Sequence, residues 1–418
     1  MTSAWAEHDP RFRTAEPASV TAIGRLDAFD IVFFILVAAI TTAGPWLREA
    51  GPAGFGAFAL YSLFYAALRR TLFELNWFVA FVGIGLIYIA LSYGDLLPRA
   101  WTVYDEPDSI PMQSSFVWAF YLILCAGRAF FVRALQSKHA AALFAALILL
   151  NLFVSPPLEM AIMPIHLQEQ GLLGAAFTNL ANSETVMLLG IAHLTMALRH
   201  RLLFYAGAAF ALVSVFFGFS IQIYASFAMF VILHARAVAP WAFFTAIAAF
   251  TASCILGPLF IELTEFAAVD PNTAIRGYMW YDAIDLFFSS YGLGVGFGRE
   301  LLSNVYLAMN VLTVYDDADI MMGGIHNSFI SMFARLGLLG GGVFALAILR
   351  TASPSGRPSP LREPAYFAFF MAYISCWVNV AVESPMTSIG TALLFGYVMA
   401  ARDLERQAPA DGSPRHDA

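Results

Sequence analysis

The chain has 418 residues, of which 60% are hydrophobic and only 12% are charged, with a formal net charge of -7. Soluble domains are roughly half apolar and one quarter charged, so this composition excludes a soluble globular protein. Repeated apolar runs, each about long enough to cross a bilayer, predict an all-α, polytopic integral membrane protein.

The two ends of the chain are polar. Residues 1–26 contain no apolar core followed by a small-residue cleavage site, so we expect no cleavable signal peptide and a cytoplasmic N-terminal tail. Residues 402–418 form a short tail rich in Ala, Pro and charge. Residues 27–401 between them form a single transmembrane domain. Its cysteines, Cys125, Cys254 and Cys376, lie singly in apolar runs, which argues against disulfides and a zinc site.

The apolar runs and their breakers predict about twelve spanning helices. Their approximate ranges are 30–47, 54–68, 75–93, 115–132, 139–155, 183–198, 202–218, 220–235, 238–260, 327–349, 364–384 and 386–401. Most of the 22 basic residues fall on one side of this topology, and the positive-inside rule makes that side cytoplasmic. Both termini are then cytoplasmic, and the largest loop, about 261–326, lies outside.

The large outer loop carries nine acidic residues but only two arginines, Arg276 and Arg299. Asp270 followed by Pro271 predicts a helix start, with the carboxylate as N-cap and the proline at the first helical position. The following stretch is amphipathic and is expected to lie on the membrane surface. Arg276 and Trp280 are four residues apart and share a face of it. A second short helix is expected at about 300–313.

His326 and Asn327 stand where the outer loop meets the next span. An imidazole at a water boundary can take a proton from a hydroxyl near neutral pH. Asn327 can orient the ring or bind a sugar hydroxyl. For both residues the structural alternative is to cap the start of the helix.

Arg276 and Arg299 each offer a planar fork of donors that suits a phosphate group. The alternative is pairing with nearby carboxylates such as Asp282 or Glu300. Glu383 and Asn379 share a helix face near the outer end of a span, so both can line one cavity. Further polar groups within spans are His193 and Gln222.

Glycines punctuate the same region. The run Gly292, Gly294, Gly296 and Gly298 fits neither a P-loop nor a dinucleotide fingerprint, and it predicts a tight turn whose amides approach an anion or another helix. The set from Gly337 to Gly342 lies inside a span, where small residues permit close helix packing. The acidic group Asp316, Asp317 and Asp319 lacks the rest of a calcium loop and is expected to be solvated, so no metal site is predicted.

His326-Asn327, nine residues, and then Gly337-Leu338-Leu339-Gly340 form a pattern together with Arg276, Trp280, Gly294, Gly296 and Gly298. This pattern resembles the bacterial O-antigen ligase and polymerase superfamily, which also includes O-linked protein oligosaccharyltransferases. The resemblance covers about residues 270–345 in motif, and the rest of the chain only in topology.

The resemblance implies a metal-independent, inverting glycosyl transfer at the periplasmic face of the bacterial inner membrane, with no cofactor. A glycan would pass from an undecaprenyl diphosphate carrier to an acceptor hydroxyl on lipid A core or a growing polymer. His326, with Asn327, would assist the hydroxyl, and Arg276 would bind the donor diphosphate. Expected partners are these saccharides, the bilayer and other polysaccharide assembly proteins, with no nucleic acid.

Two features depart from the family pattern. Many members carry an arginine after a Ser-x-Ser turn in a middle span, whereas the corresponding FGFSIQIYASF here has no basic residue. Gln222, Arg299 or Arg335 is the candidate to compensate. Arg335 itself occupies a position that is often acidic in relatives, and we predict that it adds positive charge toward the donor diphosphate.

Three other functions fit the same topology. A polymerase of O-antigen or exopolysaccharide repeat units shares every motif with a ligase. A transporter or flippase of lipid-linked sugars would show coupled charges and kinked helices at mid-membrane. A purely structural membrane partner would tolerate loss of His326.

Overall fold

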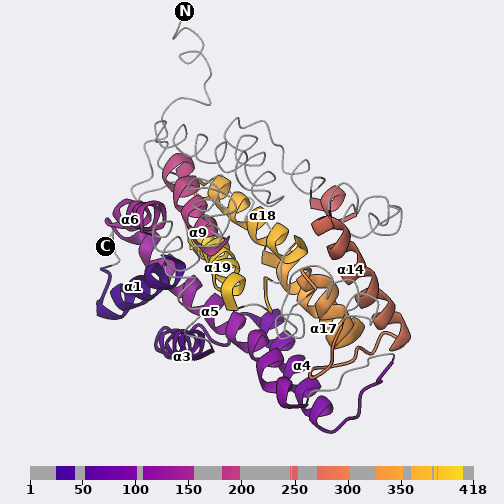
Figure 1. The fold of residues 1–418 in the computed structure, drawn as a ribbon. Helices are drawn as coiled ribbons and strands as arrows, with labels where there is room; N and C mark the ends of the chain where they lie inside the picture. Colours follow the sequence, from indigo (N-terminus) through magenta and orange to yellow (C-terminus); the bar gives the residue numbers. More distant parts are fainter. Residues whose placement is uncertain are drawn as a thin grey trace, which may run out of the picture.

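The computed structural model describes residues 25–42, 52–100, 107–154, 181–197, 245, 247–252, 271–301, 325–351, 359–378, 381–383 and 385–407. Every element of regular structure within these ranges is a helix, as Figure 1 shows, so the predicted all-α class is confirmed for this part of the chain.

The helices follow the predicted apolar segments closely. They are α1 (Ala28–Thr42), α3 (Pro52–Leu68), α4 (Asn76–Tyr93), η2 (Pro107–Ser109), α5 (Ile110–Gln136), α6 (Ala140–Phe153), α9 (Ala181–Ala192), η3 (His193–Ala197), α14 (Pro271–Ser289), α17 (Ser328–Thr351), α18 (Arg362–Val378) and α19 (Pro385–Gln407). The segments predicted at 202–218 and 220–235, most of 238–260, and most of the helix predicted at 300–313 lie outside the described residues.

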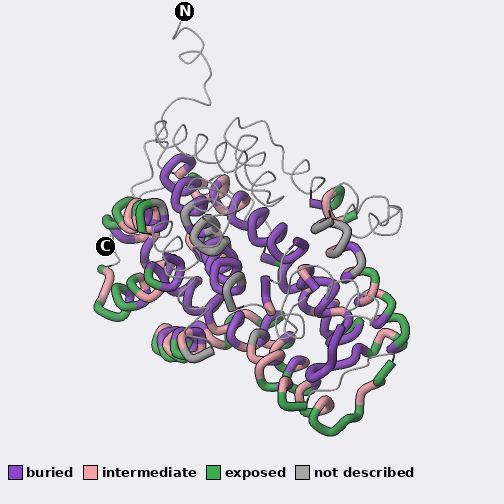
Figure 2. The backbone as a smooth tube through the Cα atoms, viewed as in Figure 1, coloured by how far each residue is buried: buried purple, intermediate pink, exposed green. Residues whose placement is uncertain are grey.

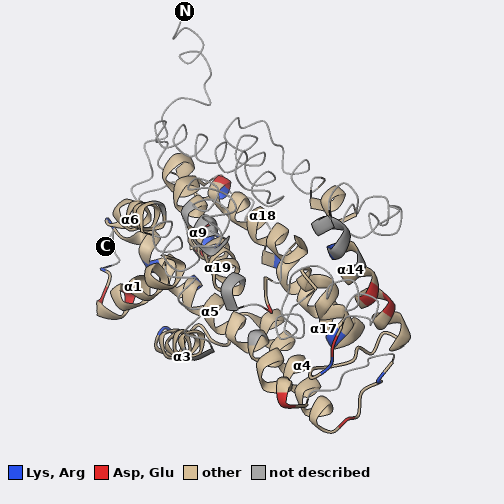
Figure 3. Cartoon of the chain, viewed as in Figure 1, with Lys and Arg blue, Asp and Glu red and all other residues tan. Residues whose placement is uncertain are grey.

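Three stretches within the described ranges are long and apolar enough to cross a membrane: Asn76–Tyr93, Pro107–Gln136 and Ser328–Thr351. Shorter apolar helices lie beside them, at Ala28–Thr42, Gly54–Leu68, Ala140–Asn151 and Leu188–Ala197. Figure 3 shows charged residues as a small minority along the helices. This supports a membrane protein, while the number twelve and the topology stay predictions.

Prolines set two helix boundaries. α14 begins at Pro271, as the Asp-Pro pair predicts, because proline suits the first helical position. The segment predicted as one helix at 364–384 is shorter: α18 ends at Val378 and residues 381–383 form a turn. Pro385 begins α19, and proline disfavours helical backbone at the residue before it. Glu383 therefore lies in a turn and not on a helix face.

The core lies where α5, α18 and α19 pack together. Nearly every described residue of α18 and most of those of α19 are buried, whereas α4 and α14 expose one side (Figure 2). Aromatic rings fill the interior, and Phe369 packs edge-on against Phe395 at a centroid distance of 6.0 Å. Figure 1 shows α14 and α17 side by side at one end of the molecule, next to α4.

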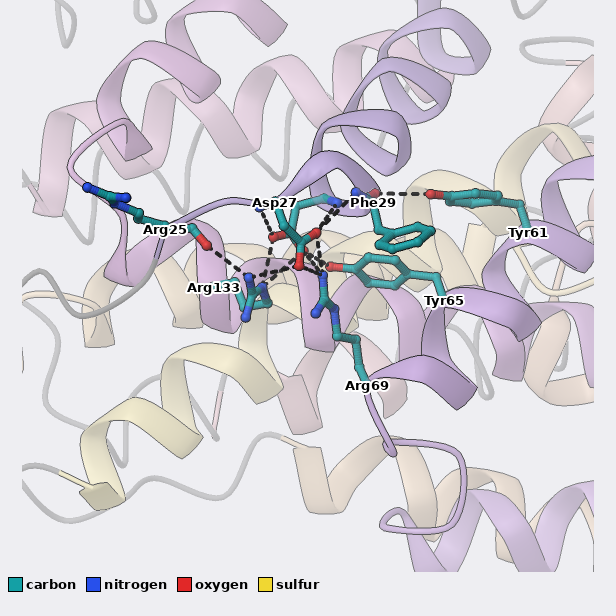
Figure 4. Close-up of polar contacts among 8 residues, drawn as sticks. Arg25, Asp27, Phe29, Tyr61, Tyr65, Arg69 and Arg133 are labelled. Atoms are coloured by element: carbon teal, nitrogen blue, oxygen red, sulfur yellow. Dashed lines mark hydrogen bonds and ion pairs between the residues drawn. The ribbon is translucent and has the colours of Figure 1, made fainter.

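A charged cluster joins α1, α3 and α5 near their ends (Figure 4). The fully buried Asp30 accepts hydrogen bonds from Tyr65 Oη at 2.5 Å, Arg69 Nη2 at 2.8 Å and Arg133 Nε at 2.8 Å. Asp27 accepts from the same two arginines, at 2.7 Å from Arg69 and 3.3 Å from Arg133. Two carboxylates thus balance two guanidinium groups, which makes the burial tolerable.

Removing the buried carboxylate should destabilise the fold. We expect Asp30→Asn to lower the free energy of unfolding by about 3 kcal/mol, because two arginines lose the charge that compensates their burial. Asp27→Asn is the matched control, since the Asp27 side chain is 43% exposed and the expected loss is about 1 kcal/mol. Denaturant titration of the purified protein in detergent measures both, and equal losses would contradict this account.

Candidate active site

His326 lies immediately before α17 in a strained backbone conformation. Its φ of 50° is in the left-handed region, which costs roughly 1 kcal/mol for a residue with a Cβ. The ring atom Nδ1 is buried and has no hydrogen-bond partner among the described residues. Strained backbone of this kind gathers at functional sites, where the surrounding fold imposes it.

Helix α14 flanks His326 and supplies two of the predicted residues. Trp280 Nε1 donates to the carbonyl oxygen of Ile325 at 3.0 Å, which fixes the peptide that precedes His326. Arg276, one turn earlier, places Nη1 3.5 Å from the Val378 carbonyl oxygen at the end of α18. The structure therefore places Arg276, Trp280 and His326 around one point, although their roles in a reaction stay predictions.

The electrostatic surroundings keep His326 neutral. Burial lowers the pKa of the imidazole, and the positive charge of Arg276 acts in the same direction, so that the pKa is about 4. At neutral pH the ring is therefore an uncharged proton acceptor, and a negative charge placed next to Arg276 would raise this pKa again.

Asn327 and Ser328 start α17 and attach the turn that carries Glu383. Asn327 Oδ1 accepts from the Ile330 amide at 3.0 Å, which is the N-cap contact. Ser328 Oγ donates to Glu383 Oε2 at 3.0 Å and accepts from the Val382 amide at 3.1 Å. Asn327 therefore caps the helix, as its structural alternative predicted. Glu383 contacts Ser328, the residue that follows this cap.

The segment Tyr291–Gly298, called here the glycine loop, docks its backbone on α17. The amides of Val295 and Gly296 donate to the carbonyl oxygens of Ala334 and Arg335 at 2.9 and 2.8 Å. In return the Leu338 amide donates to Gly292 at 2.8 Å. Of the two targets predicted for these amides, an anion or another helix, the structure shows the helix.

Gly337 makes this docking possible, because it interrupts the helix inside the span where small residues were predicted to permit close packing. Its φ of 62° and ψ of -167° break α17, so the carbonyls of Ala334 and Arg335 lose their usual partners in the helix. A Cβ on Gly294 would strike the Gly337 nitrogen, and one on Gly337 would strike Leu293. Gly340, beyond the break, does pack closely as predicted, next to Ile84 of α4.

Arg299 anchors the end of the glycine loop, and its contacts do not favour the predicted role in donor binding. Its Nη2 pairs with Asp95 Oδ1 at 2.7 Å. Its Nη1 donates to the carbonyl oxygens of Pro98 at 2.5 Å and Leu97 at 3.2 Å. The side chain is buried by these contacts, so the alternative of carboxylate pairing holds, and Asp95 is a partner.

Arg335 has a similar structural task. Its Nη1 donates to Gln113 Oε1 of α5 at 2.9 Å and to the carbonyl oxygens of Arg299 and Gly296 at 3.2 and 3.3 Å. Gln113 in turn accepts from the Gly298 amide at 2.8 Å. Only 9% of Arg335 is exposed, so this arginine clamps the glycine loop and is poorly placed to meet a diphosphate directly.

Several predicted residues lie apart from this group. Gln222, Asn379 and the acidic group 316–319 are outside the described residues. His193 is buried elsewhere: its Nδ1 lies 2.8 Å from Tyr397 Oη, and its ring stacks on Phe144 at a centroid distance of 4.1 Å. We therefore assign His193 to packing.

The sequence did not reveal the residues that hold the glycine loop from α4 and α5. Tyr88 Oη donates to the Leu293 carbonyl at 2.6 Å, and Ser92 Oγ accepts from the Phe297 amide at 2.9 Å. Nor did it single out Ser331, whose buried hydroxyl has no partner among the described residues. The contacts from α4 and Gln113 join positions about 200 residues apart, so no local pattern indicates them. Ser331 was detectable from the sequence, because it follows Asn327 by four residues.

The glycine contact gives a sharp test of the loop. We expect Gly294→Ala to lower the free energy of unfolding by roughly 3 kcal/mol, because an alanine would need a φ of 77° and would clash with backbone. Gly342→Ala is the matched control: nothing lies within 4 Å, and alanine favours a helix. Denaturant titration should show no loss for Gly342→Ala, and similar losses for both variants would refute the docking.

The pKa of His326 predicts a pH dependence of stability. The unfolded chain binds a proton at His326 below pH 6.5, but the folded protein does so only below about 4. Stability present above pH 6.5 is therefore lost as the pH falls toward 4, by up to about 3 kcal/mol. Unfolding of the wild type and of His326→Ala across this range should differ by that slope, and parallel curves would show an ordinary histidine.

No protein-family model matches this chain, and a comparison with curated proteins finds no match either. A functional assignment therefore rests on the residues around His326 and on the motif resemblance.

Proposed function

We propose that this chain is a membrane glycosyltransferase of the O-antigen ligase type. It would move a glycan from undecaprenyl diphosphate to a hydroxyl of lipid A core, at the periplasmic face of the bacterial inner membrane. The observation that carries the proposal is His326 beside Arg276, with a strained backbone and a buried Nδ1 that has no hydrogen-bond partner among the described residues. The spacing from His326-Asn327 to Gly337 and Gly340 supports it as a resemblance.

In the proposed reaction, His326 acts on the acceptor and Arg276 acts on the donor. The acceptor hydroxyl gives its proton to Nδ1 of His326 as its oxygen attacks the anomeric carbon with inversion. The bond from that carbon to the phosphate oxygen breaks, and the electron pair leaves with the diphosphate. Arg276 stabilises that charge, and the imidazolium later releases its proton to water.

The low pKa of His326 fits such a mechanism only if the donor changes it. Without a ligand, Arg276 opposes protonation of the ring. A bound diphosphate would neutralise Arg276 and add negative charge nearby, which raises the basicity of His326. The base would then become effective when the donor is in place, so that proton transfer is tied to donor binding.

A polymerase of O-antigen or exopolysaccharide repeat units uses the same residues, and the acceptor distinguishes it from a ligase. The transporter alternative receives less support. The charged cluster around Asp30 is internally balanced and lies near helix ends, at the start of α1, after the end of α3 and toward the end of α5. A transport pathway would place coupled charges near the middle of the spans.

We expect His326→Ala to reduce transfer by about a hundredfold or more, the usual contribution of a general base. Arg276→Ala should cost a similar factor, because charge on the leaving group is left unstabilised. The measurement is a gel profile of surface and carrier-linked polysaccharide from a deletion strain complemented with each variant. Polymer trapped on the carrier with bare core outside indicates ligase, and single repeat units or loss of secreted polymer indicates polymerase.

Two substitutions serve as controls for this experiment. His139→Ala removes an exposed histidine at the turn before α6. Arg99→Ala removes an exposed arginine whose side chain is 65% accessible. Both should leave the profile unchanged. Full complementation by His326→Ala and Arg276→Ala, with normal protein levels, would rule the transferase out.

A further inference from the structure

Asn327 and Ser331 form a short row of buried polar groups that leads from His326 along α17. Asn327 is the N-cap of α17 and Ser331 lies one turn into the helix, where its amide donates to the Asn327 carbonyl oxygen at 3.0 Å. Both residues are fully buried. Asn327 Nδ2 and Ser331 Oγ have no hydrogen-bond partner among the described residues.

The helix itself does not account for these two groups. Asn327 already caps α17 through Oδ1, and that leaves its amide nitrogen with two unused donors. The neighbouring Ser328 shows what a structural serine does here, because its hydroxyl both donates to Glu383 and accepts from Val382. Ser331, one turn further along, makes no such contact. Buried polar groups are ordinarily paired, so this row calls for a partner that the described part of the chain does not supply.

The chemistry of the row indicates what that partner is. Asn327 offers N–H donors and Ser331 an O–H group, and both are neutral, whereas Arg276 on α14 carries a positive charge. Neutral amides and hydroxyls suit the uncharged oxygens of a sugar, and a guanidinium suits phosphate. The row also adjoins His326, which is where the acceptor hydroxyl must lie if the imidazole takes its proton.

We infer that Asn327 Nδ2 and Ser331 Oγ bind the acceptor sugar through its hydroxyl or ring oxygens while His326 faces the reacting hydroxyl. The inference rests on the proposed glycosyl transfer and assigns the α17 side of the site to the acceptor and the α14 side to the donor diphosphate. Ser331 is then a determinant of acceptor affinity.

The test uses purified full-length protein in lipid nanodiscs. The donor is carrier-linked glycan extracted from the deletion strain, and the acceptor is the molecule that the gel profile identifies. We expect Ser331→Ala to raise the KM for the acceptor about fivefold, as loss of one hydrogen bond to a ligand does, with the KM for the donor unchanged. An unchanged KM for the acceptor would overturn the inference.

Ser62→Ala is the matched control. Ser62 is also a fully buried helical serine whose hydroxyl has no partner among the described residues, but it lies on α3, which packs on α5 and α1. Both variants should be at least as stable as the wild type, because neither removes a hydrogen bond of the free protein and each removes a buried hydroxyl that has no partner among the described residues, and only Ser331→Ala should change the KM. A loss of stability confined to Ser331→Ala, with unchanged KM, would make Ser331 a structural residue.

A binding measurement separates sugar from phosphate as the ligand of the row. Undecaprenyl diphosphate without any sugar should bind Ser331→Ala as it binds the wild type, and should bind Arg276→Ala more weakly. Equal weakening by both variants would place phosphate on the row and overturn the sugar assignment. Full transfer by His326→Ala would instead reject the glycosyltransferase itself, so the two failures are distinguishable.

Discussion

The backbone contact between the glycine loop and the break in α17 is the constraint on which the site depends. Gly294 and Gly337 approach so closely that neither position has room for a Cβ. The break at Gly337 releases the carbonyls of Ala334 and Arg335, and loop amides satisfy them at 2.8 to 2.9 Å. Because buried backbone groups must be paired in a membrane protein, the break and the loop require each other.

Two arginines attach the glycine loop and α17 to α4 and α5. Arg299 connects the loop to the turn after α4, and Arg335 connects it to Gln113 of α5. The hydrogen bonds of both guanidinium groups shown here go to carbonyl and side-chain oxygens of the chain. Arg299 and Arg335 therefore have a structural role, whereas Arg276 lies beside His326.

The sequence predicted the features that depend on local rules. The apolar runs located most of the described helices, although α19 continues to Gln407, six residues into the predicted C-terminal tail, and the Asp-Pro pair predicted the start of α14. The spacing of Arg276 from Trp280 predicted that both share one face of α14, since helix geometry fixes which residues share a face. Features that depend on a single helix, such as its start or the residues on one of its faces, were therefore predictable from the sequence.

Contacts between distant segments were beyond such reasoning. Whether Arg335 faces a ligand or clamps a loop depends on Gln113, 222 positions earlier in the chain, and no local pattern joins the two. Glu383 was predicted on a helix face, but Pro385 divides that segment and Ser328 binds the resulting turn. Gly294 belongs to a run that predicted a tight turn and Gly337 to a set that predicted close helix packing, yet only the fold shows that the two residues meet.

The polar atoms around His326 that lack hydrogen-bond partners among the described residues raise the free energy of the folded protein. His326 Nδ1, Asn327 Nδ2 and Ser331 Oγ are buried without partners among the described residues, and each such group costs about 1 to 3 kcal/mol. The junction of the glycine loop with α17 supplies the rigidity that keeps these groups in place despite that cost. A ligand that pairs with these groups would recover that free energy on binding, which is how the proposed acceptor sugar would gain affinity at this site.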